Sequence, residues 1–159
     1  MTAGRETVAA IFLLRDDGAA LLQKRDDKAG LSHAGMWTPP GGHCEPGESV
    51  EACARREFEE ETAYRLGDLH LLTAFLDDNA RGFPPLWLTI FWSVYDGVQQ
   101  VECREGQALD FIRREAAVQC AIPQYLVDIW DRAIDASLAA GRLPPGPLRV
   151  SGSGADDGR

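Results

Sequence analysis

Residues 42–64, which read GHCEPGESVEACARREFEEETAY, are the most informative segment of the sequence. Residues 48–66 contain no proline or glycine, and their apolar side chains recur at helical spacing. These apolar residues are Val50, Cys53, Ala54 and Phe58. A period of this kind predicts an α-helix over residues 48–66, with one face turned to a core.

Three glutamates, Glu57, Glu60 and Glu61, project from one side of this helix because three and four positions separate them. Like charges at such spacing destabilise an isolated helix by about 0.2–0.5 kcal/mol per pair. Glu57 shares the apolar stripe, so its carboxylate should sit at the edge of the core, where a cation must compensate it. Grouped carboxylate oxygens suit Mg²⁺ or Mn²⁺. A solvated helix face would explain Glu51 and Glu59 but not Glu57, so the sequence favours a metal site.

A loop rich in glycine and proline precedes the helix and reads PPGGHCEPGE over residues 39–48. Gly41 and Gly42 permit backbone conformations closed to other residues, so amide groups there can approach a ligand closely. Ser49 is suited to begin the helix, whose N-terminal amides favour anions. Other phosphate and nucleophile motifs (GxxxxGKS/T, GxGxxG after a strand, HExxH, GxSxG) do not occur in the body of the chain.

Taken together, these residues resemble the Nudix box, the signature of the Nudix hydrolase family, written GX₅EX₇REUXEEXGU with U a bulky apolar residue. The six fixed identities that match are Gly42, Glu48, Arg56, Glu57, Glu60 and Glu61. One fixed position departs, because the last glycine of the signature is Ala63 here. An alanine held in a left-handed conformation costs about 1 kcal/mol, so we expect the helix to continue past Ala63 and to end near Gly67.

The resemblance implies hydrolysis of a nucleoside diphosphate linked to another group, with Mg²⁺ as the cofactor and Mn²⁺ as an alternative. It implies that Glu57, Glu60 and Glu61 are the metal ligands. Arg56 is implied to orient a neighbouring glutamate, with Glu48 as its ion-pair partner. Such a metal lowers the pKa of a bound water that attacks phosphorus. Either Glu60 or an acid outside the box takes the proton of that water.

Segments outside the box extend the resemblance to MutT-like members. Residues 22–25, LQKR, resemble a strand that carries a phosphate-contacting arginine, which implies that Arg25, with Gly41 and Gly42, binds substrate. The segment REGQALDF from Arg104 resembles one that supplies a further glutamate. Glu105 is then a fourth ligand or the base, with a solvated loop acid as the alternative. Arg81 lies in the polar loop 77–85, and because such loops often shape the substrate pocket in this fold, Arg81 is a further candidate for substrate binding.

Strand and helix patterns alternate along the remaining chain. Strands are expected at residues 8–14 and 19–24 around an Asp-Gly turn, at 69–76, at 86–95 and, more weakly, at 98–103 and 108–112. Residues 26–43 are expected to form a long loop. Apolar residues at helical spacing predict a final helix over residues 122–139 that packs on the sheet. The sequence therefore predicts an α/β fold, an α/β/α sandwich with a mixed central sheet, as the Nudix resemblance implies.

The length and net charge of the chain limit the number of domains and the kinds of ligand that it is expected to bind. The 159 residues suit one domain, predicted over residues 1–140, and 45% of them are hydrophobic, enough to build a core. The formal net charge of −9 argues against a nucleic-acid polymer but not against a small nucleotide carried with Mg²⁺. No apolar run approaches the ~18 residues of a membrane span, and the first residues lack the core of a secretory signal. A monomer and a homodimer both remain open.

Cysteine usage and the C-terminal composition complete the expectations. The four cysteines show no CxxC spacing, so Cys44 and Cys53 are expected to pack as thiols in a reduced, cytoplasmic protein. From Gly141 to Arg159, glycine, proline, serine and aspartate supply 12 of 19 residues, which predicts a flexible tail without function.

Two classes of function follow. The leading hypothesis is a MutT-like pyrophosphohydrolase that splits a nucleoside triphosphate into the monophosphate and pyrophosphate. Nucleotide sugars, ADP-ribose and dinucleoside polyphosphates are alternative substrates. A nucleotide-binding regulatory domain without catalysis is the alternative of another class. The three clustered carboxylates argue against that class, because a module that only binds has no need of them.

Overall fold

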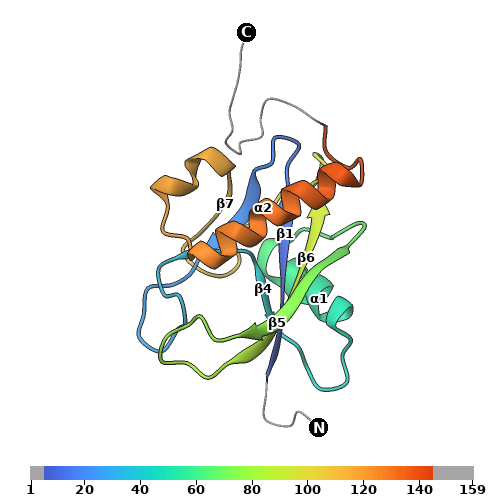
Figure 1. Ribbon diagram of the computed structural model, residues 1–159. Coiled ribbons are helices and arrows are strands. Elements are labelled where there is room, and N and C mark those ends of the chain that lie inside the picture. The colour runs from blue at the N-terminus through green and yellow to red at the C-terminus, as the bar shows by residue number, and fades with distance from the viewer. Residues whose placement is uncertain (1–5, 145–159) are drawn as a thin grey trace.

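The computed structural model describes residues 6–144 (Figure 1). Strand β1 (Thr7–Leu14) is the central strand of its sheet. The strands after it are β2 (Ala20–Lys24), β3 (Trp37–Thr38), β4 (Gly41–His43), β5 (His70–Asp77), β6 (Leu86–Val94) and β7 (Ala108–Ile112). The helices are α1 (Val50–Thr62), the short 3₁₀ helix η1 (Arg114–Gln119) and α2 (Gln124–Ala139). The strand order is β3-β2-β1-β6-β5, with β4 added to β1 and β7 to β2.

The sheet is mixed, because β1 runs parallel to β6 while the other strand pairs are antiparallel. Helix α2 crosses one face of the sheet and α1 lies against the other (Figure 1). The predicted α/β/α sandwich is therefore confirmed. No helix among residues 6–144 is long and apolar enough to cross a bilayer.

Strand β1 is apolar throughout because both of its faces are covered. Ala10, Phe12 and Leu14 belong to the core under α2, whereas Ala9, Ile11 and Leu13 belong to the core under α1. A strand covered from two sides reads as a continuous apolar run rather than an alternating one. This arrangement fixes α1, with its glutamates, against the start of β1.

Helix α1 ends earlier than the sequence predicts, and the expectation that it continues past Ala63 is wrong. Ala63 adopts the left-handed conformation (φ 66°, ψ 4°), and its N–H donates to the Glu59 carbonyl at 2.9 Å. The turn delivers Tyr64 into the core, where its ring meets Phe58 edge-on at 6.1 Å and is 1% exposed. Burial of this large ring outweighs the strain at Ala63.

The predicted strand over residues 98–103 is absent from the described chain. There the N–H groups of Glu102 and Arg104 donate to the carbonyls of Thr62 and Glu61 instead. The segment therefore caps the end of α1 rather than extending the sheet. Within the predicted loop 26–43, β3 and β4 form two short strands, and η1 follows β7 where no helix was expected.

The first residues of the predicted tail belong to the packed body. Leu143 is 5% exposed within the core under α2, and Arg142 Nη2 lies 3.0 Å from Asp68 Oδ2. Residues 145–159, which hold the rest of the predicted tail, lie outside the described residues.

Candidate functional site

The site begins where β4 runs between β1 and α1. Gly41 pairs with Ala10 and Gly42 with Ala9 in the antiparallel ladder. A Cβ added to Gly41 would overlap the Ala9 carbonyl oxygen, and one added to Gly42 would overlap the Glu57 carboxylate. Glycine is therefore required at both positions by close approach, and the loop lies directly against the first of the three glutamates.

Glu61 is the buried carboxylate of the site, with 6% of its surface exposed. Its Oε1 accepts a hydrogen bond from the Gly41 N–H at 3.2 Å and another from Gln23 Nε2 at 3.3 Å. Burial, followed by repulsion from the carboxylates of Glu105 and Glu57, raises the pKa of Glu61 to about 8. Glu61 on α1 therefore feels the negative charge of Glu57, on the same helix, and of Glu105, on the loop before β7.

Arg56 organises the other side of the site. Its Nε and Nη2 contact both carboxylate oxygens of Glu48 at 2.7 and 2.9 Å, and its Nη1 lies 2.9 Å from Glu57 Oε2. The two-point contact lowers the pKa of Glu48 to about 2 and raises the pKa of Arg56. The predicted pairing of Arg56 with Glu48 is therefore confirmed, and the same guanidinium also contacts Glu57.

Glu60 is more exposed to solvent than Glu57 and Glu61. Its side chain is 59% exposed, and its Oε1 lies 3.3 Å from Arg56 Nη1. In the described part of the chain no three His, Cys, Asp or Glu side chains are gathered as a finished metal-binding group. The carboxylates of Glu57 and Glu60 both contact Arg56 Nη1 instead.

The donor set nevertheless fits a hard divalent cation. Glu57 and Glu61 are largely buried carboxylates one helical turn apart, and Gln23 Nε2 donates both to Glu61 and to the backbone carbonyl of the exposed Glu105 on the neighbouring loop. Buried like charges at this spacing are unfavourable unless a cation neutralises them. Oxygen ligands of this kind are those that Mg²⁺ and Mn²⁺ accept. The assignment of Glu57, Glu60 and Glu61 as metal ligands stays a prediction.

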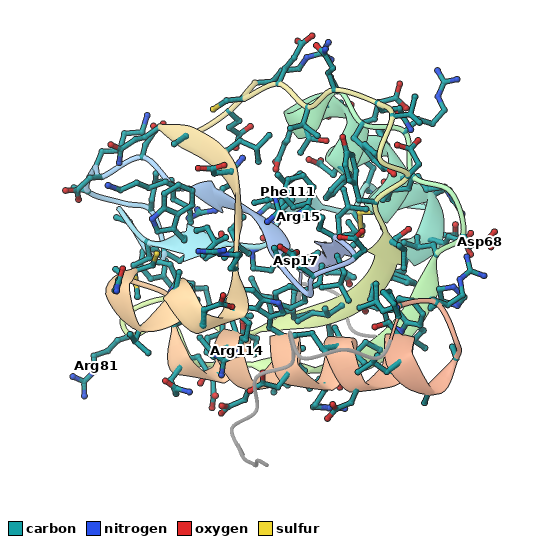
Figure 2. The ribbon with its side chains drawn as sticks, turned by 90° about the horizontal axis from the view of Figure 1, so that it is seen from above. Arg15, Asp17, Asp68, Arg81, Phe111 and Arg114 are labelled. Carbon is teal, nitrogen blue, oxygen red and sulfur yellow. A yellow bond between two sulfur atoms is a disulfide. The ribbon has the colours of Figure 1, made fainter. Side chains whose placement is uncertain are left out.

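The residues predicted to bind substrate lie at different distances from the glutamates. Arg25 follows β2 directly, two residues beyond Gln23, and its Nε donates to the Ser32 carbonyl at 2.7 Å. Arg81 projects from the edge of the molecule opposite α1 (Figure 2). The structure therefore places Gly41 and Gly42 beside the glutamates, whereas the Arg25 guanidinium is held at the Ser32 carbonyl and Arg81 lies away from the glutamates.

A separate cavity of about 450 Å³ does not coincide with the carboxylates. Its lining includes Arg15, Asp17, Trp37 and Phe111, and three of these side chains meet near the centre of Figure 2. The Arg15 guanidinium is paired with Asp17 at 2.7 Å and lies 5.3 Å from the centre of the Phe111 ring. None of the α1 glutamates lines this cavity, so the chemistry is assigned to the carboxylate cluster instead.

Two features of the site were not predicted from the sequence. Cys44 and Cys53 form a disulfide with their Cα atoms 5.2 Å apart, so the expectation of packing thiols is wrong. Cys44 follows β4 and Cys53 lies in the second turn of α1, which brings their backbones within disulfide range although their spacing is no known motif. The second feature that the sequence did not predict is the contact of Gln23 with Glu61. The one amide side chain in the otherwise apolar segment ALLQ of β2 could have indicated it.

Comparison with known proteins agrees with this geometry. A family model described as NUDIX domain matches residues 4–125. The nucleoside triphosphatase NudI of Escherichia coli O1:K1 / APEC is 46% identical over 69 residues, which are 43% of this chain and 45% of that protein. The chain thus matches less than half the length of these curated relatives.

Solved structures share the fold. The MutT protein from Methanosarcina mazei Go1 superposes with a TM-score of 0.66 at 21% identity, over 86% of this chain and 98% of that one. The NUDIX domain of Shewanella oneidensis NrtR, solved with ADP ribose, superposes with a TM-score of 0.71 at 14% identity, over 84% and 88%. At such identities the two likenesses establish a common architecture.

Proposed function

The chain belongs to the NUDIX domain family, and from that premise we propose that it is a Mg²⁺-dependent hydrolase. Its proposed substrate is a nucleoside triphosphate, split into the nucleoside monophosphate and pyrophosphate. The observation that carries the proposal is the buried Glu61 carboxylate, held by the Gly41 N–H and by Gln23 beside Glu57 and the Glu105 loop. A buried carboxylate next to other acidic residues is unfavourable for the fold alone, and a bound cation would neutralise it.

Glu57 and Glu61 would hold the cation, with Glu60 as the further ligand from α1. Bound there, Mg²⁺ would neutralise diphosphate oxygens and lower the pKa of an attacking water. Arg56 keeps Glu57 in place through its Nη1 contact, while Glu48 fixes the guanidinium from the other side. For Glu60 to reach the cation, its exposed side chain must leave Arg56, which a weak 3.3 Å pairing permits.

Glu105 is the proposed base. It lies on a loop of its own rather than on α1, and it faces Glu61 closely enough to raise the pKa of that carboxyl. A carboxylate beside the metal ligands but outside the helix is free to accept the proton of the attacking water. Glu60 is the alternative base, because its side chain is the most exposed of the three α1 glutamates.

Substrate binding is assigned to the glycine loop and to Arg25. The Gly41 N–H already donates to a carboxylate oxygen, which shows that this loop presents backbone donors toward the site. Arg25 carries a permanent positive charge next to the strand that contacts Glu61, and its guanidinium would pair with a phosphate group. Release from the Ser32 carbonyl is the local rearrangement that this pairing requires.

The choice of a nucleoside triphosphate rests on the relative NudI, whose name is nucleoside triphosphatase. The matched segment covers less than half of that relative, so the substrate is carried over as a proposal. Nucleotide sugars, ADP-ribose and dinucleoside polyphosphates are the alternatives within the same chemistry. The NrtR neighbour, solved with ADP ribose, makes ADP-ribose the first of these to test.

A release assay with purified protein and Mg²⁺ tests the proposal. The substrates are the common and oxidised nucleoside triphosphates, ADP-ribose, a nucleotide sugar and a dinucleoside polyphosphate. Pyrophosphate release from a triphosphate supports the proposal. Cleavage confined to the other compounds would keep the metal chemistry and overturn the substrate. Nucleotide binding without any cleavage would point to a regulatory domain.

A further inference from the structure

Gln23 is a buried amide in an otherwise apolar strand. It lies one residue before the end of β2 and is 3% exposed. Buried amides persist where their hydrogen bonds are made, so their partners indicate their role. Gln23 Nε2 donates to Glu61 Oε1 at 3.3 Å and to the backbone carbonyl of Glu105 at 3.2 Å. One side chain therefore links a carboxylate of α1 to the loop that carries Glu105.

The loop around Glu105 is anchored by its backbone to both β2 and α1. The Gln107 N–H donates to the Lys24 carbonyl at 2.8 Å, and the Arg104 N–H donates to the Glu61 carbonyl at 3.0 Å. Gly106 has φ +85°, and a Cβ there would lie 2.5 Å from the Lys24 carbonyl oxygen. The backbone on each side of Glu105 is thus held against β2 and α1, and Gln23 supplies the side-chain contact between them.

The hydrogen bonds at Glu61 also select one of its two oxygens. Oε1 accepts from both Gln23 Nε2 and the Gly41 N–H. Within residues 6–144, Oε2 takes no hydrogen bond, so it is the oxygen available to a cation. An amide N–H suits this place because it donates to the carboxylate and adds no charge of its own.

We propose that Gln23 is a positioning residue for the divalent cation, holding Glu61 and the Glu105 loop together so that Glu61 binds the ion and Glu105 stands beside it. The inference rests on the proposed function in one respect, because it takes these two glutamates as part of the cation site. Gln23 itself touches neither the cation nor the substrate. Its effect must therefore appear in metal affinity, independently of turnover.

Mn²⁺ binding measured by the loss of the free-ion electron paramagnetic resonance signal tests this role without any substrate. Gln23→Met keeps the length of the side chain and removes both donated bonds. We expect its dissociation constant for Mn²⁺ to rise about 10–100-fold, the range found for residues that support metal ligands. Gln99→Met is the matched control, since the Gln99 amide also bridges two segments, Arg65 and Asp96, but contacts no carboxylate of the site.

A double-substitution cycle separates positioning from general structural support. If Gln23 acts through Glu105, Gln23→Met and Glu105→Gln together should weaken Mn²⁺ binding by less than the product of their separate effects. Separate effects that multiply would contradict this role, as would an affinity of Gln23→Met within twofold of the wild type. If Gln23→Met melts below the assay temperature, Gln23→Asn gives the same test, because it is too short to reach both partners.

Failure of the proposed role of Gln23 can be distinguished from failure of the proposed hydrolase activity. A wild-type chain that binds Mn²⁺ but cleaves no nucleotide would overturn the hydrolase and leave the role of Gln23 supported by the cycle. A wild-type chain that cleaves nucleotides while Gln23→Met binds Mn²⁺ normally would overturn the role of Gln23 alone. A wild-type chain that binds no Mn²⁺ would overturn the positioning role outright.

Discussion

Glu61 is the residue at which folding and chemistry make opposite demands. Its carboxylate is buried next to two others, which raises its pKa to about 8. Two hydrogen bonds, from Gly41 and Gln23, hold it in place in spite of the repulsion. Such an arrangement is expected where a ligand rather than the fold selects the residue.

Substitution of Glu61 should therefore remove activity and spare the fold. Glu61→Gln keeps an oxygen that can accept from the Gly41 N–H but loses the charge that would hold the cation. We expect pyrophosphate release to fall at least 10²-fold, with a melting temperature equal to or above that of the wild type. Glu59→Gln is the control, because Glu59 is a partly exposed neighbour paired only loosely with Arg65, at 3.6 Å. Unchanged turnover in Glu61→Gln would refute the metal-site assignment.

The same carboxylate predicts how stability depends on pH in the metal-free protein. Between pH 4.5 and about 8 the unfolded chain has released the Glu61 proton while the folded chain retains it. The unfolding free energy should then decrease with rising pH, by ~1.4 kcal/mol per unit at most for this group, and level off above about pH 8. Urea unfolding in the presence of a chelator measures the slope. Parallel slopes for the wild type and Glu61→Gln would show that Glu61 titrates normally.

At the scale of elements, α1 shows where sequence patterns succeed and where they fail. Its period and its start at Ser49, whose Oγ accepts from the Ala52 N–H at 3.1 Å, could be predicted from local signals. Its end could not, since the burial of Tyr64 depends on a core built by distant strands. The expected strand over residues 98–103 failed similarly, because the carbonyls at the end of α1 compete for its N–H groups.

The left-handed Ala63 gives a stability prediction for the end of α1. Ala63→Gly relieves the steric cost of φ 66° and should raise the unfolding free energy by about 1 kcal/mol. Chemical denaturation at one pH measures the change. A gain of this size also tests the observed end of the helix, because a helix that continued to Gly67 would instead be weakened by a glycine at position 63.

The disulfide gives a second prediction at this scale. It closes a loop of about ten residues between β4 and α1, for which loop entropy gives ~2–3 kcal/mol of stabilisation. A reductant should lower the unfolding free energy by that amount in the wild type and have no such effect in Cys44→Ala. Cys103→Ser, which removes a cysteine that the structure leaves free, serves as the control and should respond to the reductant as the wild type does.

At the scale of the whole molecule, the sandwich was predictable because its longest strands carry strong patterns. β1 and β6 are apolar runs, and α2 has an apolar stripe that includes Leu126, Ile129 and Trp130. The carboxylates of α1 were predictable from their spacing. The partnership of Gln23 with Glu61 and Glu105 was not, because it joins residues 38 and 82 positions apart in the chain.

Phosphorus NMR of a nucleoside triphosphate incubated with the protein and Mg²⁺ shows directly which phosphoanhydride bond is cleaved. The proposed chemistry predicts signals of the nucleoside monophosphate and pyrophosphate in equal amounts, both absent when Glu61→Gln replaces the wild type. Orthophosphate with the nucleoside diphosphate would contradict it, since that pair places the cleavage at the terminal phosphate.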